Sequence, residues 1–302
     1  SANLRKQLSG GIFPWQRPAR ADRMARPSGL LRWFSPATVA VVRKDLLLIP
    51  RDLTNMAQVL SPLAIGAFFI VQQLLYPIRI GGADVSQPFL QPLLAMLSAI
   101  IASGIASMIT SRFGITGFSF EGKRFWVLQA APIPRRDLVV AKFLVGYLPF
   151  LGLSGALVLL LEAARAISDA RALPGGVSLG AVLGALDPVL VGYAWLVCAV
   201  VGAGVMAISL ALGAARPNMR WDSPHEMMTP DLGCISIVLY GAYTAVAVLS
   251  LAMPMAFSRM VVLGDARLIL WAAGLVVGLG GTAVVVATSL RLAAGEVAGI
   301  GD

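Results

Sequence analysis

The stretch Phe118-Ser-Phe-Glu-Gly-Lys-Arg-Phe-Trp-Val-Leu-Gln-Ala-Ala-Pro-Ile-Pro-Arg-Arg-Asp137 decides the fold class, because it is a polar island between two long apolar segments. Charged residues, aromatics and prolines alternate in it, whereas the segments on either side are almost entirely apolar. A helix of about 20 apolar residues crosses a bilayer. The pattern therefore predicts a multi-pass membrane protein in which this stretch is a loop exposed to water.

The composition of the whole chain favours the same class. The 302 residues are 58% hydrophobic and 13% charged, whereas about 25% of the residues in a soluble domain are charged. The net charge of +9 does not indicate nucleic-acid binding, because the basic residues lie in loops beside apolar runs. Such loops face anionic lipid headgroups in the cytoplasm. We expect membrane lipids as partners and no nucleic acid.

Six apolar segments predict six transmembrane helices in an all-α integral membrane protein. Residues 1–34 form a basic, Pro-rich arm that we expect to be partly disordered, and 36–50 form an interfacial helix that Ser35 can cap. Residues 35–302 are predicted to form one transmembrane domain. Its spans lie at about 56–76, 89–111, 141–162, 187–213, 233–256 and 267–290. In the last span, Gly274 and Gly278 form a small-xxx-small pattern that predicts close helix packing.

The distribution of basic residues predicts the topology. The N-terminal region through Arg51, the 112–142 region and the segments with Arg216, Arg220 and Arg291 hold 19 of the 24 Lys and Arg residues. Cytoplasmic loops are enriched in these residues. We therefore expect both termini and the 112–142 loop in the cytoplasm of a bacterium, with the spans in its plasma (inner) membrane.

Several chemical functions are disfavoured by the sequence. Gly117–Lys123 fits the start of a phosphate-binding loop, but Arg124 stands where Ser or Thr should hold magnesium, and an apolar span precedes it instead of a strand. The spans lack ionisable residues at their centres, which argues against ion-coupled transport and intramembrane catalysis. Two cysteines, Cys198 and Cys234, and the single His225 match no metal motif.

Two polar loops are the candidate functional regions. Segment 119–130 is predicted to form a short helix along the inner membrane face, and an ordinary positive-inside loop is the alternative. The loop that contains Arg216, Asn218, Trp221 and Asp222 could be a second docking surface or simply a solvated loop.

Four segments together resemble one transporter family. They are Val42–Asp52, Glu121–Leu128 with Ala131–Pro134, Ala141–Phe143, and Arg216–Asn218 with Trp221–Pro224. With them the chain resembles the permease (transmembrane) subunit of an ATP-binding-cassette exporter of the second type. The resemblance implies a six-helix half-transporter with a coupling helix between spans 2 and 3. The residues it implies for ATPase docking are Glu121, Lys123, Arg124, Phe125, Trp126, Arg135 and Arg136.

The resemblance also implies the partners and the function. The partners are a cytoplasmic cassette ATPase subunit, which binds ATP and magnesium, and a second permease half that is a copy or a homologue. The chain would bind no cofactor directly, would not be an enzyme, and would move a substrate outward when the ATPases close. Two alternatives stay open. One is a membrane-embedded lipid-modifying enzyme or scaffold that uses Asp222, His225 and Glu226, and the other is an ion-coupled secondary transporter.

Overall fold

The described part of the chain is entirely helical. The computed structural model describes residues 34–48, 53–76, 90–130, 133–171, 177–219, 221, 227, 229–260 and 266–299. Within these ranges every regular element is a helix and no strand occurs, which confirms the predicted all-α class. The predicted arm, 1–34, lies outside the described residues except for Phe34.

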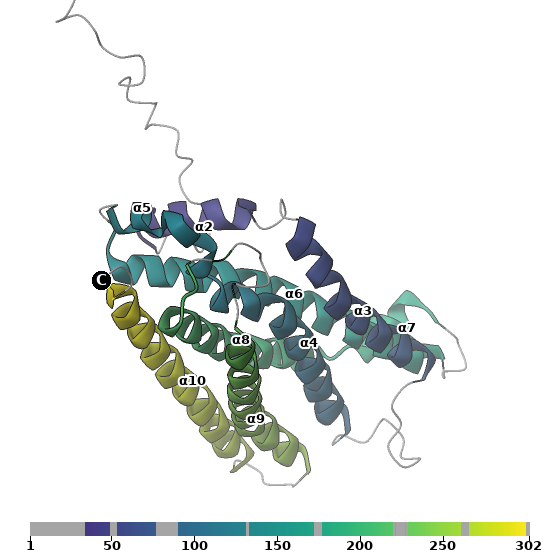
Figure 1. Ribbon diagram of the computed structural model, residues 1–302. Coiled ribbons are helices and arrows are strands. Elements are labelled where there is room, and N and C mark those ends of the chain that lie inside the picture. Colours follow the sequence, from purple (N-terminus) through teal and green to yellow (C-terminus); the bar gives the residue numbers. More distant parts are fainter. Residues whose placement is uncertain are drawn as a thin grey trace, which may run out of the picture.

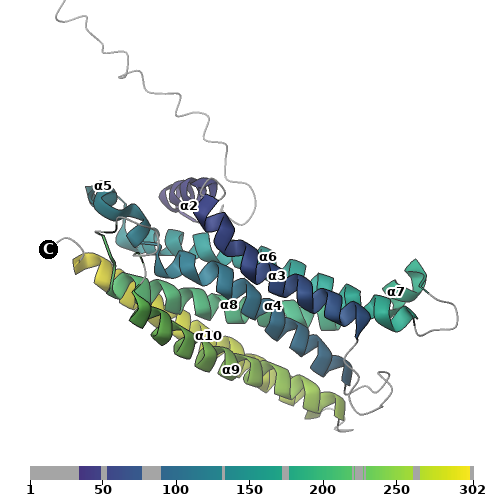
Figure 2. The same cartoon turned by 45° about the vertical axis from the view of Figure 1, so that its right-hand side comes forward.

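Long helices form the bundle, and short helices lie at its two ends (Figures 1 and 2). In chain order the elements are α2 (Pro36–Leu48), α3 (Leu53–Leu75), α4 (Leu90–Ile115), η5 (Ser119–Arg124), α5 (Phe125–Ala130), α6 (Arg135–Arg171), α7 (Leu179–Ala185), α8 (Pro188–Ala215), α9 (Pro230–Met260) and α10 (Ala266–Gly299). Both views place α2 and α5 at one end and α7 at the other.

Helix α8 is the centre of the bundle and packs against α4, α6, α9 and α10. Its apolar stretch is 67% buried, against 17% for that of α10. Helix α8 approaches α6 closely because residue 202 is a glycine. A Cβ atom at this position would lie only 2.2 Å from the Phe150 ring. In contrast, α9 and α10 expose Ile237, Ile269 and Val276 by about 70% each. Apolar surface of this extent suits a lipid environment better than water.

Among the described residues, five helical segments are long and apolar enough to cross a membrane. They are Gln91–Ile115, Arg135–Arg171, Pro188–Ala215, Asp231–Met255 and Leu268–Val297. The first predicted span, 56–76, corresponds to α3; the part of its apolar run with described side chains, Leu60–Leu75, is shorter than the about 20 residues of a typical span. The structure therefore shows five candidate spans, and the sixth stays a prediction.

Helix α6 is much longer than its predicted span. It has 37 residues, which corresponds to about 55 Å, whereas the apolar run predicted only 141–162. The extension at its C-terminal end, Ala163–Arg171, is rich in alanine, which favours helix, and in polar residues, which end an apolar run. Pro149 lies inside α6 without ending it.

Two short elements also differ from the expectation. The segment 119–130 is two helices, the 3₁₀ helix η5 and α5, with a break at Gly122, which has φ +50° and ψ −136°. Helix α7 was not predicted; the Ser178 side chain caps it by accepting a hydrogen bond from the Ala181 N–H.

Candidate functional site at the α2 end of the bundle

One end of the bundle gathers segments that are far apart in the sequence. We call it the α2 end: helices α2, η5 and α5, the first turns of α6 and the last turns of α8 and α10 (Figures 1 and 2). Its apolar core contains Val42, Phe118, Phe125, Val139, Leu210 and Ala293, which come from α2, the residue before η5, α5, α6, α8 and α10. The end is therefore a single packed unit.

The start of α2 is fixed to the start of α6. The Thr38 N–H donates to Ser35 Oγ at 3.2 Å, which is the expected helix cap. Ser35 Oγ in turn donates to Asp137 Oδ2 at 2.6 Å, and Thr38 Oγ1 donates to the Asp137 carbonyl at 3.4 Å. The cap therefore joins two helix starts that are about a hundred residues apart.

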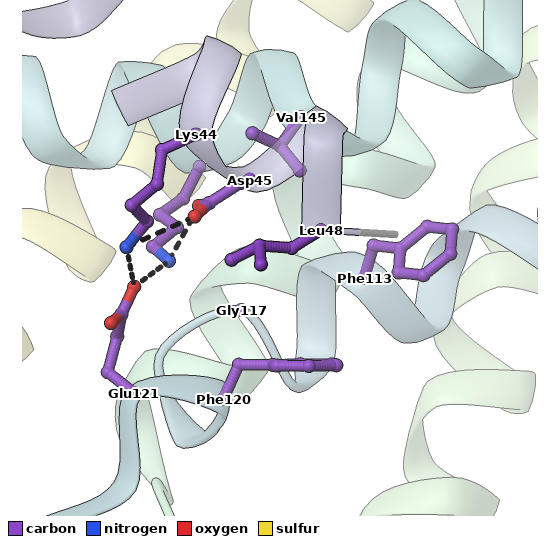
Figure 3. Close-up of a pocket in the computed structure, with 9 residues that line it drawn as sticks. Lys44, Asp45, Leu48, Phe113, Gly117, Phe120, Glu121 and Val145 are labelled. Atoms are coloured by element: carbon purple, nitrogen blue, oxygen red, sulfur yellow. Dashed lines mark hydrogen bonds and ion pairs between the residues drawn. The ribbon is translucent and has the colours of Figure 1, made fainter. Parts of the chain in front are cut away.

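Four charged side chains form an ionic cluster between α2, η5 and α6 (Figure 3). Lys142 Nζ lies 2.8 Å from both Asp45 Oδ2 and Glu121 Oε1. Lys44 Nζ lies 2.8 Å from the same Glu121 oxygen and 3.2 Å from Asp45 Oδ1. The Lys142 side chain is 4% exposed and that of Lys44 is 43% exposed. Lys142 is thus the buried centre of the cluster.

The two lysines keep Glu121 ionised. Burial by itself raises the pKa of Glu121, but Lys142 and Lys44 outweigh this effect, so that its pKa is lowered from the ordinary value. Burial lowers the pKa of Lys44, but Glu121 and Asp45 outweigh it, so that its pKa is raised. Both groups therefore carry their charges at neutral pH.

A pocket lies beside the cluster. It encloses about 90 Å³, and its walls come from α2, α4, η5 and α6. Its lining residues are Lys44, Asp45, Leu48, Phe113, Gly117, Phe120, Glu121, Lys142 and Val145. Figure 3 shows Lys44, Asp45 and Glu121 at one side and Phe113, Leu48 and Phe120 at the other. The pocket therefore has a charged end and an apolar end.

The loop after α8 is bound to η5. The indole Nε1 of Trp221 donates to the Ser119 carbonyl at 2.7 Å, and the Asn218 N–H donates to Ser119 Oγ at 3.1 Å. A Cβ atom at Gly122 would lie 3.2 Å from Trp221 Nε1. The two candidate loops therefore form one surface, which no sequence pattern indicated.

A family model described as a putative ATP-binding cassette matches residues 9–174, more than half of the chain. The chain belongs to this family. All four residues of the ionic cluster lie within the matched range. No curated protein and no solved structure matches the chain.

Membership of the putative ATP-binding cassette family corrects the expected identity. The predicted exporter permease that moves a substrate outward is wrong, because the matching family is described as a cassette and not as a permease. The prediction rested on four short segments of charged, aromatic and turn residues, which are common in membrane-protein loops. The predicted relation of the chain to ATP-binding-cassette systems is supported by the same family match. The lipid-enzyme alternative gains no support, since Asp222, His225 and Glu226 lie outside the described residues.

The family description raises the question of whether the described residues fit a nucleotide. The only G-x-x-x-x-G-K segment, Gly117–Lys123, follows helix α4 and continues into η5, whereas a phosphate-binding loop joins a strand to a helix. Phe118 is fully buried in the core, and the Glu121 carboxylate faces the two lysines. Two carboxylates neutralise the two lysines of the cluster, so it offers no net positive charge to the phosphates of a nucleotide. This segment therefore does not fit a nucleotide, and no described group of His, Cys, Asp and Glu could hold a metal ion.

The predicted docking residues differ in their surroundings: some are buried or partly buried at the α2 end and others are exposed. Glu121 belongs to the ionic cluster, and Phe125 is 4% exposed and packs edge-on against Phe118. Arg135 and Arg136 are exposed at the start of α6. The backbones of Lys123, Arg124 and Trp126 lie in η5 and α5, and their side chains lie outside the described part.

The remaining predicted residues lie in two other places. Arg216 is exposed and forms an ion pair with Asp231 at 2.7 Å. A Cβ atom at Gly274 would lie 2.4 Å from Pro254 Cγ, and one at Gly278 would lie 2.5 Å from Leu251 Cδ2. The two glycines are therefore at the contact between α10 and α9.

Three residues of the cluster were not among the predicted site residues. Lys44 and Asp45 lie in the predicted interfacial helix, 36–50, and Lys142 lies at the start of the predicted span 141–162. The isolated lysine between Ala141 and Phe143, at the start of an apolar run, does indicate an ion pair, because a lysine buried there needs a partner. Its partners lie 97 and 21 residues away, so the sequence could not name them.

Proposed function

We propose that this chain is a membrane-embedded docking component of an ATP-binding-cassette assembly, which holds the nucleotide-hydrolysing part at the cytoplasmic face of the plasma (inner) membrane. The family relation and the five apolar helices support it. In this proposal α3 is a sixth span and both termini lie at the α2 end. A second helical half, a copy or a homologue, completes the assembly.

The ionic cluster is the observation on which this proposal rests. It connects α2, η5 and α6 through a lysine that is 4% exposed, and its four charges satisfy one another. A fully paired buried network fixes the relative positions of the elements that it joins. A docking component needs such a stiff attachment to its bundle, and α6 runs from this end to the other (Figure 2).

The proposed contact surface is formed by α5 together with the flanking arginines. Arg135 and Arg136 are exposed beside it, and Arg43 on α2 is also exposed. This basic surface suits an acidic groove on the partner, since complementary charge favours specific association. Glu121 and Phe125 then support this surface, because they hold η5 and α5 in place. The second loop supports η5 through Trp221 and Ser119.

Charge reversal at the α2 end tests the docking proposal. The double variant Arg135→Glu with Arg136→Glu should weaken co-purification of the ATPase partner by at least about tenfold, because two attractive contacts become repulsive. The control is Arg171→Glu, an exposed arginine at the opposite end of the same helix. Equal recovery of the partner by both variants would contradict the proposal.

In this proposal ATP and magnesium are bound by the partner and not by this chain. The geometry of Gly117–Lys123 supports this assignment, because Phe118 is buried and Glu121 is acidic. Titration of the purified chain with a fluorescent ATP analogue and Mg²⁺ should give no saturable signal. Saturable binding that disappears in Lys123→Ala would show a nucleotide site in this chain and would overturn the assignment.

A further inference from the structure

The pocket beside the ionic cluster has the two-sided chemistry of an amphiphile site. Lys142 supplies a charged side chain that is 96% buried, while Leu48 and Phe120 at the apolar end are 51% and 40% exposed. The volume of about 90 Å³ holds a small polar group but not a lipid with its chains. Acyl chains of a bound amphiphile would therefore lie outside, along the exposed Leu48 and Phe120.

The depth of the pocket matches that of a lipid headgroup. Phe113 lies at the end of the candidate span Gln91–Ile115, and Lys142 lies near the start of α6. The pocket is therefore where spanning helices reach the polar layer of the bilayer. This step rests on the membrane placement in the proposed function.

The charges of the cluster select among headgroups. Two lysines and two carboxylates give no formal net charge, so a simple anion would meet lysines that are already neutralised. A lysine ammonium has three N–H donors, and Lys142 uses two of them on Asp45 and Glu121. Both lysines bind Glu121 through Oε1, which leaves Oε2 out of these ion pairs. The cluster can therefore donate to a phosphate and accept from an ammonium.

We propose that this pocket binds the headgroup of a phospholipid that carries both a phosphate and a primary ammonium, as phosphatidylethanolamine does. The remaining lysine donors bind the phosphate oxygens, and Glu121 Oε2 accepts from the ammonium. A choline headgroup has no N–H to donate, and a glycerol headgroup has no cation. The pocket therefore prefers the ethanolamine headgroup to either of these.

Lipid retention tests the proposal. The chain is purified in mild detergent from membranes that contain all three phospholipids, and the retained lipid is counted by native mass spectrometry. We expect selective retention of phosphatidylethanolamine. Lys142→Gln should reduce it by about tenfold through loss of charge-assisted hydrogen bonds. Equal retention of the three lipids would overturn the proposal.

A second pair of variants separates binding from folding. Leu48→Ala removes an apolar wall of the pocket and should also reduce retention, whereas Leu47→Ala, equally exposed on the same helix but outside the pocket, should not. A reduction by both variants would contradict a specific pocket. Val145→Phe should block the pocket while leaving all four charges in place.

Two further measurements isolate the source of the ligand and the membrane placement. Glycerophosphoethanolamine, which has the headgroup without chains, should not displace the lipid at micromolar concentration; displacement would identify a soluble ligand and overturn the lipid assignment. Carbonate extraction tests membrane placement separately. If the chain stays in the membrane fraction but shows no lipid preference, the lipid-binding proposal is refuted and the docking proposal is not.

Discussion

At the scale of single residues, Lys142 has the largest effect on the α2 end. It is the most buried member of the ionic cluster and contacts both carboxylates. Lys44 contacts the same two carboxylates but is 43% exposed. The difference in burial means that the two lysines should not be energetically equivalent, because water screens exposed ion pairs.

Replacement of each lysine by methionine measures this difference. Lys142→Met leaves Asp45 and Glu121 paired only with the partly exposed Lys44 and should lower the free energy of unfolding by about 2–4 kcal/mol. Lys44→Met should lower it by less than about 1 kcal/mol. Unfolding in mixed detergent micelles, followed by circular dichroism, gives both values. Equal effects would show that Lys142 is not the centre of the cluster.

The pKa shifts predict how the cluster responds to pH. Because the pKa of Glu121 is lowered in the folded chain, its stabilising contribution is present above the ordinary value of 4.5 and is lost as the pH falls through the lowered pKa. Because the pKa of Lys44 is raised, its contribution is present below 10.5 and is lost as the pH rises through the raised pKa. The cluster should therefore be intact between these two values.

The stability difference between the wild type and Glu121→Gln checks this window. We expect the difference in unfolding midpoint to be constant between about pH 5.5 and 9.5 and to shrink only in more acidic solution. A difference that changes near pH 7 would mean that Glu121 titrates there and is not held ionised by the lysines.

At the scale of elements, the sequence predicted where helices occur better than where they end. Apolar runs located α4, α6, α8, α9 and α10, because about 20 apolar residues are sufficient for a span. They missed the polar extension of α6 beyond residue 162, since its alanines favour helix without being strongly apolar. They also missed the break at Gly122, which lies close to the Trp221 ring from a distant loop.

The candidate site was predicted only in part for the same reason. Glu121 was singled out from its loop, but the cluster needs Asp45 from α2 and Lys142 from α6. Helix packing brings Asp45 and Glu121 to Lys142 from positions 97 and 21 residues away in the sequence. Local spacing holds no information about such pairs.

Gly122 gives a test of the break between η5 and α5. Its φ of +50° disfavours any residue with a Cβ atom, and an added Cβ would lie 3.2 Å from Trp221 Nε1. Gly122→Ala should therefore cost about 1–3 kcal/mol of unfolding free energy. Gly104→Ala is the matched control in helix α4, where nothing lies within 4 Å of an added Cβ. That control should be neutral or stabilising by up to about 1 kcal/mol, and similar losses in both variants would contradict the assigned conformation.

At the scale of the whole molecule, the arrangement of the ends constrains the topology. The segments assigned to one side by their basic residues, namely α2, η5 with α5, the start of α6 and the end of α10, lie together at the α2 end (Figure 1). Helix α7 lies at the opposite end (Figure 2). In a bundle that crosses a membrane once per long helix, these two ends face different compartments.

Cysteine labelling in intact cells tests this arrangement. With Cys198 and Cys234 replaced by alanine, a single cysteine is introduced at Arg135, exposed at the α2 end, or at Leu179, 77% exposed on α7. A membrane-impermeant maleimide should label Leu179→Cys in intact cells and Arg135→Cys only after permeabilisation, because basic segments stay in the cytoplasm. If α3 is the sixth span, a cysteine at Phe34, before α2, should behave like Arg135→Cys. Labelling of the Phe34 variant in intact cells, with Arg135→Cys protected, would leave an odd number of crossings between the two positions and exclude the six-span topology, while the helical bundle itself would be unaffected.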